Sequence, residues 1–235
     1  MVSEFLEKAL QKSQIEIPAD KFESFEKYFN LLVEWNEKIN LTAITKADEV
    51  AVKHFEDSLA VFKYVNIKNN AKIIDVGTGA GFPGIPLKIA RDDLNLTLLD
   101  SLNKRLVFLQ TVCNELNIEA ETVHSRAEEG SRKVEYRDSY DYAFSRAVAQ
   151  LNLLTELCLP YVKKGGYFIA LKGPDATEEI ENAKKAIGIL GGKIKDVIEY
   201  NISDNSGRTL VIIEKVKNTP DKYPRHGSKL KSNPL

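Results

Sequence analysis

The chain has 235 residues, of which 43% are hydrophobic and 29% are charged. This is long enough for one good-sized domain, or for a domain with a small appendage. No apolar run approaches the roughly 20 residues that a membrane span needs. The first residues also lack the basic-then-apolar order of a signal peptide. We therefore expect a soluble, cytoplasmic protein with no membrane partner.

The net charge of −1 is unevenly distributed along the chain. Residues 215–235 carry six cations against Asp221 alone, a net charge of +5, so the rest of the chain carries −6. A basic tail on an acidic body is typical of nucleic-acid binding, although a solvated, disordered terminus explains the charge equally well.

The two cysteines, Cys113 and Cys158, both lie among leucines. They are too few for a disulfide framework, and they form no metal-ligand cluster with the three histidines. We interpret both as buried small hydrophobic residues and predict no metal site.

The first ~65 residues predict helices. From Pro18 and Asp20 onward, apolar side chains recur at steps of three and four, until Asn40-Leu41-Thr42 ends the stripe. The residues on this stripe are Phe22, Phe25, Phe29, Leu32, Trp35 and Ile39. A shorter helical pattern follows, carried by Val50, Phe55, Leu59 and Phe62.

From Lys72 onward, predicted strands alternate with predicted helices, which indicates parallel strands covered on both faces. The strands are expected at 72–76, 95–100, 119–123, 140–144, 165–171, 193–200 and 208–215. The helices are expected at 84–91, 103–117, 149–162 and 175–190. The last two strands flank a turn-rich stretch and indicate a hairpin, which makes the last strand antiparallel.

These elements predict an α/β protein of the Rossmann-like kind, with a mostly parallel seven-stranded sheet, an antiparallel last strand and an N-terminal helical extension. We divide the chain into the helical extension at 1–66, a cofactor-binding domain at 67–216 and a basic tail at 217–235.

The most informative stretch is a glycine loop that follows the first strand. The strand leads into Gly77, Gly79 and Gly81, and then into a helix that contains Pro86 in its first turn. Glycines allow a tight turn and the close approach of a ligand, and the helix N-terminus offers free N–H groups.

The next strand ends at Asp100, whose carboxylate can accept hydrogen bonds from both hydroxyls of a ribose. Together with the loop, this acid predicts a pocket for an adenosine-containing cofactor. The spacing Gly79-x-Gly81-x-x-Gly84 even matches the dinucleotide pattern of NAD enzymes. Asp75, which can order the loop or reach a methionine amino group, and the bulky Phe82-Pro83 step favour S-adenosylmethionine instead.

Motifs along nearly the whole chain resemble the RsmG (GidB) family, bacterial methyltransferases that act on N7 of a guanine in 16S ribosomal RNA. The resemblance rests on the stretches Leu32–Asn36, Asn40–Thr42, His54–Ser58, Asp75–Gly84, Leu99–Arg105, Ser125–Glu128, Ser145–Ala147, Leu171–Gly173 and Thr219–Arg225. It implies a class I methyltransferase fold with S-adenosyl-L-methionine as cofactor. It also implies 16S rRNA, or an assembling small ribosomal subunit, as partner, and we expect the chain to be monomeric.

The resemblance also implies roles for matching residues. Asp100 contacts the ribose, and Ala127 and Glu128 flank the adenine. The full set of implied cofactor contacts is Gly77, Gly79, Phe82, Asp100, Ala127, Glu128 and Arg146. Arg146 is in addition expected to position the substrate, because it lines the place where the methyl group meets the base.

Methylation at N7 of guanine needs no general base, because N7 is a lone-pair nucleophile and alignment with the methyl group suffices. We accordingly name none. His54, on a mostly apolar helix, is interpreted as structural, and Cys158 is not expected to be a nucleophile. Capping or core hydrogen bonding explains Asn40 and Asp57, although the family pattern is compatible with contacts to substrate.

RNA is expected to be held by the tail and by cations near the pocket, which are Lys104, Arg105, Arg126, Arg146 and Lys172. Tyr223, between Lys222 and Arg225, is expected to stack on a base. Two alternatives remain open from the residues alone. One is an NAD-dependent oxidoreductase, for which the chain lacks a Tyr-x-x-x-Lys relay, and the other is a non-catalytic RNA-binding protein.

Overall fold

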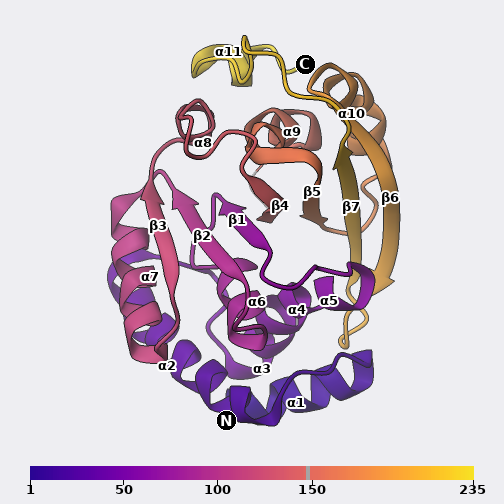
Figure 1. The fold of residues 1–235 in the computed structure, drawn as a ribbon. Coiled ribbons are helices and arrows are strands. Elements are labelled where there is room, and N and C mark those ends of the chain that lie inside the picture. The colour runs from indigo at the N-terminus through magenta and orange to yellow at the C-terminus, as the bar shows by residue number, and fades with distance from the viewer. Residues whose placement is uncertain (147–148) are drawn as a thin grey trace.

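The computed structural model describes residues 1–146 and 149–235 and is built around a central seven-stranded sheet (Figure 1). The strand order is β3-β2-β1-β4-β5-β7-β6. The strands are β1 (Lys72–Val76), β2 (Asn95–Asp100), β3 (Ala120–His124), β4 (Tyr140–Arg146), β5 (Val162–Lys172), β6 (Gly192–Asn201) and β7 (Gly207–Lys215). β1 to β5 pair in parallel, whereas β7 is antiparallel to both of its neighbours. The predicted mixed sheet and the antiparallel last strand are confirmed.

Helices follow most strands, as expected, and cover both faces of the sheet. They are α6 (Gly84–Ala90), α7 (Asn103–Leu116), α8 (Ala127–Gly130), α9 (Leu151–Cys158) and α10 (Thr177–Ile189). α9 is shorter than the predicted 149–162, because Pro160 has no N–H for an α-helical bond and a 3₁₀ turn at Leu159–Tyr161 takes over. Ala147, which ends one of the family-like motifs, lies outside the described residues.

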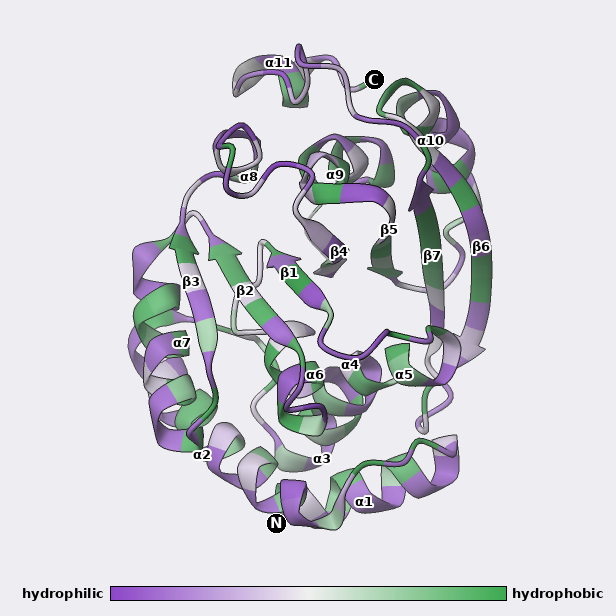
Figure 2. Ribbon diagram, viewed as in Figure 1, coloured by the Kyte–Doolittle hydropathy of each residue, from purple (hydrophilic) through white to green (hydrophobic). Residues whose placement is uncertain are grey.

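Alternate residues of each strand enter two apolar cores, one on each face of the sheet. In β1, Ile73 belongs to the core shared with α6 and α7, whereas Ile74 belongs to the core shared with α9 and α10. This is the period of two expected for strands buried on both faces. Figure 2 shows the same layering in hydropathy, and no described helix is long and apolar enough to cross a membrane.

The predicted helical extension forms and packs on one face of the sheet. It comprises α1 (Val2–Ser13), a 3₁₀ turn (Ala19–Lys21), α2 (Phe22–Ile39), α3 (Ala47–Val50), a π-helical turn (Ala51–Glu56), α4 (Asp57–Leu59) and α5 (Val61–Tyr64). α2 ends where Asn40 adopts a left-handed conformation with φ 46°, so the capping interpretation of Asn40 holds.

An aromatic cluster joins this extension to the glycine loop. The ring centroid of Phe55 lies 5.0 Å from that of Phe25, 5.5 Å from that of Tyr28 and 6.0 Å from that of Phe82. The hydroxyl of Tyr28 also donates a hydrogen bond to the carbonyl oxygen of Ala80 in the loop. The proposed boundary at residue 66 therefore separates two sequence segments that share one core.

The C-terminal tail packs against the domain, so the disordered alternative is wrong for its described residues. Lys215 is fully buried, and its ammonium donates to the carbonyl oxygen of Leu159 at 2.8 Å and to the hydroxyl of Thr219 at 2.9 Å. A short helix, α11 (Ser228–Ser232), ends the fold beside α8 and α9 (Figure 1). This ordered tail brings the C-terminus to the carboxyl ends of the parallel strands.

Replacing Phe55 by alanine should destabilise the fold and loosen the glycine loop together. Deleting a fully buried ring typically lowers the free energy of unfolding by about 3–5 kcal/mol. Chemical denaturation would measure this. The matched control is Phe5→Ala in α1, because Phe5 is 43% exposed and its loss should change stability far less. Equal effects of the two substitutions would contradict the shared core.

Candidate active site

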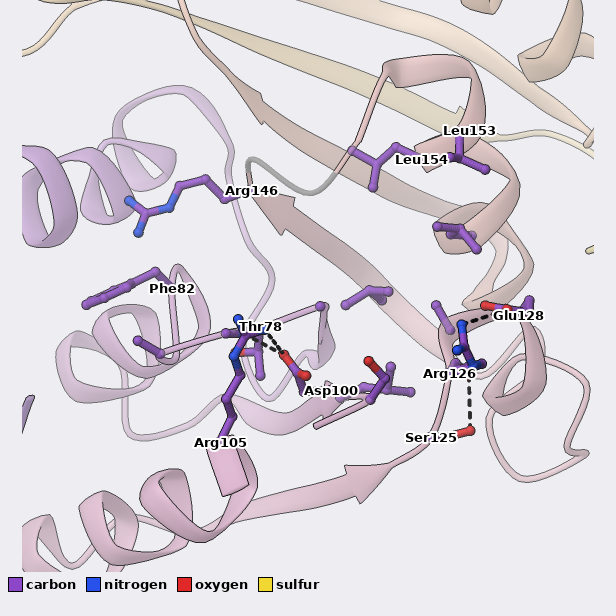
Figure 3. A pocket seen from close by; sticks show the side chains of 18 of the residues that line it. Thr78, Phe82, Asp100, Arg105, Ser125, Arg126, Glu128, Arg146, Leu153 and Leu154 are labelled. Carbon is purple, nitrogen blue, oxygen red and sulfur yellow. Dashed lines mark hydrogen bonds and ion pairs between the residues drawn. The ribbon is translucent and has the colours of Figure 1, made fainter. Parts of the chain in front are cut away.

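A cavity of about 740 Å³ opens at the carboxyl ends of β1, β2 and β4. The strand order reverses between β1 and β4, and ligands of open α/β sheets bind at such switch points. In Figure 3, Arg146 and Phe82 lie at one end of the cavity, Arg126 and Glu128 lie at the other, and Asp100 lies between them. The cavity thus brings together every residue predicted to bind the cofactor.

The glycine loop forms the floor of this cavity, and two of its glycines have distinct reasons to be there. Gly81 has φ +100°, and a Cβ on it would lie 2.6 Å from the Tyr28 hydroxyl and 2.8 Å from Ile85 Cγ1. Gly79 has φ +61°, and a Cβ there would meet nothing closer than the Gly77 carbonyl oxygen at 4.0 Å. Gly81 therefore serves internal packing, whereas Gly79 leaves the backbone open to a ligand.

Asp75 organises the loop from beneath. It is fully buried, and its Oδ2 accepts hydrogen bonds from the Thr78 hydroxyl at 2.7 Å and from the Gly84 N–H at 2.9 Å. Burial raises the pKa of Asp75 to about 6, against the opposing effect of these hydrogen bonds. Of the two roles considered for this residue, loop ordering is the one its contacts serve.

Asp100 lies at the end of β2 and is 2% exposed. Its Oδ2 accepts from the Gly79 N–H at 3.0 Å, and its Oδ1 accepts from the Leu102 N–H at 2.9 Å. Arg105, expected to hold RNA, instead pairs with Asp100 Oδ2 at 3.3 Å. The carboxylate is therefore fixed at the cavity wall, where Oδ2 already accepts two hydrogen bonds and Oδ1 can still accept a second.

At the opposite end of the cavity, α8 follows β3 and carries Ala127 and Glu128. Glu128 is 8% exposed and lies 3.9 Å from the exposed guanidinium of Arg126. Glu128 is thus not a solvated surface charge, because the short helix turns this side chain inward.

Arg146, the last residue of β4, is held on several sides by the helical extension. Its Nη1 donates to Asp57 Oδ2 at 3.0 Å and to the Lys53 carbonyl oxygen at 3.2 Å. Its Nη2 lies 3.3 Å from His54 Nδ1, and its guanidinium lies 4.8 Å from the centre of the Phe82 ring. The side chain is only 13% exposed, so this is no ordinary surface salt bridge.

Asp57, a partner of Arg146, and Arg208, the second partner of Asp57, were not predicted to form this ion-pair cluster. Asp57 is 5% exposed and pairs with Arg208 of β7 at 2.8 Å as well as with Arg146. Arg208 was not expected to belong to the site. In the sequence, Arg208 stands out only as a single cation just before the apolar run of the last strand.

A second cavity of about 370 Å³ adjoins the first and shares His54 and Arg146 with it. Four cations line it against two carboxylates, so its walls are positive. These charged residues are Lys53, Arg146, Lys172, Arg208, Asp57 and Glu179. Lys172, expected to hold RNA, is mostly buried and pairs with Glu179 at 2.6 Å.

Tyr223, expected to stack on a base, is 8% exposed. That prediction is wrong, because the ring packs against the core that α9 and α10 share. Burial also raises the pKa of the Cys158 thiol well above its usual range, which disfavours a thiolate nucleophile. Within residues 1–146 and 149–235, no three His, Cys, Asp or Glu side chains cluster to hold a metal ion.

His54 is neutral at physiological pH. Burial lowers its pKa to about 3, and the positive charge of Arg146 contributes in the same direction. Its Nε2 lies 2.8 Å from the Thr42 hydroxyl, so both ring nitrogens are occupied by protein groups. This agrees with a residue that positions Arg146 and does not transfer protons.

The unfolding free energy should therefore depend on pH through His54. Between about pH 6.5 and pH 3 the unfolded chain protonates this side chain and the folded chain does not, so stability falls as pH falls, by up to about 1.4 kcal/mol per pH unit. Asp75 acts in the opposite direction, so the effect is read as a difference between wild type and His54→Gln. Denaturation at several pH values measures it, with the exposed His124→Gln as control. Parallel curves for wild type and His54→Gln would contradict the assignment.

Comparisons with known proteins agree with this geometry. Residues 21–206 match the family described as rRNA small subunit methyltransferase G (GidB). The chain is 50% identical over 234 residues to ribosomal RNA small subunit methyltransferase G of Clostridium perfringens, covering 99% of this chain and 98% of that one. It is also 50% identical to the protein of that name from Desulforamulus reducens, over 94% and 92% of the two chains.

Solved structures share the fold at low identity. A precorrin-6y C5,15-methyltransferase from Geobacter metallireducens superposes with a TM-score of 0.52 and 13% identity, over 67% of this chain and 87% of that one. A SAM-dependent methyltransferase from Aquifex aeolicus gives a TM-score of 0.50 and 16% identity, over 67% and 90%. The oxidoreductase and non-catalytic alternatives are thereby set aside: the chain belongs to the rRNA small subunit methyltransferase G family and is a methyltransferase that uses S-adenosylmethionine.

Proposed function

We propose that this chain methylates N7 of a guanine in 16S ribosomal RNA, and that Arg146 positions the base at the junction of the two cavities. The observation that carries the proposal is the placement of Arg146, which lines both the cavity of the glycine loop and the positive cavity beside it. One cavity suits the methyl donor and the other suits a polyanion. A residue common to both is placed where the two reactants meet.

The residues of the larger cavity fit S-adenosylmethionine. Gly79 leaves its backbone open, and Oδ1 of Asp100 has the capacity to accept a further hydrogen bond from a ribose hydroxyl. Leucines 153, 154 and 157 of α9 give the cavity an apolar wall suited to an adenine ring. Gly77, Gly79, Phe82, Asp100, Ala127, Glu128 and Arg146 remain the proposed contacts.

When bound, S-adenosylmethionine supplies an electrophilic methyl group. Guanine N7 carries an available lone pair and loses no proton, so the protein must align the two reactants and exclude water. His54, at the junction, agrees with this, because it is neutral with both ring nitrogens engaged.

Arg146 is suited to hold a phosphate or to stack on a base. Asp57 pairs with it and the neighbouring rings restrict its rotation, so it is held in place before substrate arrives.

RNA binding is proposed to rely on the second cavity and on exposed cations around the first, among them Lys104 and Arg126. Arg105 and Lys172 contribute less than expected, since carboxylates already hold them. We propose that the chain acts as a monomer on 16S rRNA, or on an assembling small subunit, in the cytoplasm.

The proposal is tested by methyl transfer from labelled S-adenosylmethionine to free 16S rRNA and to small-subunit particles, both from cells that lack this enzyme. We expect one modified guanine, with the label at N7, and activity that drops steeply as salt rises. Mapping by base-specific cleavage identifies the atom. Label on an exocyclic amine or on a ring carbon would contradict the assignment of N7.

Replacing Arg146 by alanine or lysine should lower the single-turnover rate of methyl transfer by about a hundredfold, because a misplaced base loses alignment. Binding of S-adenosylhomocysteine, measured by calorimetry, should change far less. Lys184→Ala, an exposed cation of α10 remote from both cavities, serves as the control. A loss confined to cofactor binding would show that Arg146 serves the cofactor and not the base.

A further inference from the structure

The C-terminal tail passes over the carboxyl ends of the parallel strands and ends in α11 beside α8 and α9 (Figure 1). Two of its residues, Gly227 and Leu230, line the larger cavity. We infer that the tail is an anchored strap whose Leu230 forms part of the S-adenosylmethionine pocket and contacts the apolar adenine ring. The inference rests on S-adenosylmethionine being the occupant of this cavity.

One anchor of the strap is an ion pair between Arg225 and Glu156 of α9. Glu156 is fully buried, and it accepts the backbone N–H of Arg225 at 2.7 Å, its Nε at 2.9 Å and its Nη2 at 2.7 Å. Such a bidentate pair fixes orientation as well as distance. Because α9 also carries the leucines of the cavity, the anchor ties the tail to the wall it faces.

A second anchor lies upstream, where arginines of the segment after β3 hold the tail backbone. Arg137 donates to the carbonyl oxygens of Thr219 at 2.8 Å and of Tyr223 at 3.1 Å. Arg132 donates to the carbonyl oxygen of Pro224. These contacts hold the tail backbone as far as Pro224. Only a few residues therefore separate the anchored segment from Gly227 at the cavity.

Leu230 is 2% exposed and lies outside the two large apolar cores. It lines the cavity together with leucines 153, 154 and 157 of α9. Because protein already covers most of Leu230, its side chain is held in place and gives the cavity a preformed apolar border, which suits an apolar ligand surface. The tail thereby adds an apolar wall opposite the polar glycine loop.

This assignment differs from a role of the tail as an RNA arm. Arg225 is paired with Glu156 and Tyr223 is buried, so neither side chain is available to RNA. Among the described tail side chains, the cations Lys217, Lys222 and Lys229 are exposed. The two roles are separable, because Leu230 and Lys229 are neighbours on the same helix and present different chemistry.

The experiment compares wild type, Leu230→Ala, a chain ending at His226, and the control Lys229→Ala. The truncated chain keeps the Arg225–Glu156 anchor, so we expect the fold to be retained, and chemical denaturation checks this. Calorimetry with S-adenosylhomocysteine, and hydrogen exchange of residues 226–235 with and without it, are the measurements. We expect the dissociation constant to rise about tenfold in Leu230→Ala and at least as much in the truncated chain, about 1.4 kcal/mol.

Lys229→Ala should bind as wild type does, and the wild-type tail should gain protection when S-adenosylhomocysteine is added. Equal dissociation constants for wild type, Leu230→Ala and the truncated chain would overturn the inference alone. Failure of wild type to bind S-adenosylhomocysteine would overturn the cofactor assignment and the inference with it. A loss of RNA affinity in the truncated chain, with unchanged cofactor affinity, would assign the tail to RNA instead.

Discussion

The carboxylate of Asp57 connects the helical extension to the two strands, β4 and β7, that border the proposed site. It is buried between the guanidinium groups of Arg146 and Arg208, at 3.0 and 2.8 Å. Through it, the helical extension is joined to the end of β4 and to the start of β7. A buried carboxylate without these partners is costly, and two arginines without it repel each other. All three groups are therefore held in one arrangement.

Apolar contacts reinforce that arrangement from the other side of Arg146. Phe82 lies against Arg146 and against His54, whose ring centroid is 4.5 Å away, and its ring also belongs to the cluster around Phe55. The π-helical turn that carries His54 is a rare geometry, often found at functional sites. The extension thus shapes the proposed site.

Local patterns predicted the sheet, the antiparallel last strand and the glycine loop, because strand alternation and turn chemistry act over a few residues. The resemblance to the family indicated Asp100, Glu128 and Arg146 as site residues, and all three line the cavity. Local patterns did not reveal the pairing of Asp57 with Arg208, since those residues lie 151 positions apart. The burial of Tyr223 and the anchoring of the tail were not predicted either. Composition gives the charge of a segment, but it does not show which distant residue pairs with that charge.

His54 and Arg146 line both cavities. An occupant of one cavity that displaces either side chain also changes the walls of the other. Binding of the methyl donor and binding of RNA are then thermodynamically linked, and the coupling free energy must be the same in both directions. With the occupants proposed above, the shared arginine would make the affinity for each reactant depend on the presence of the other.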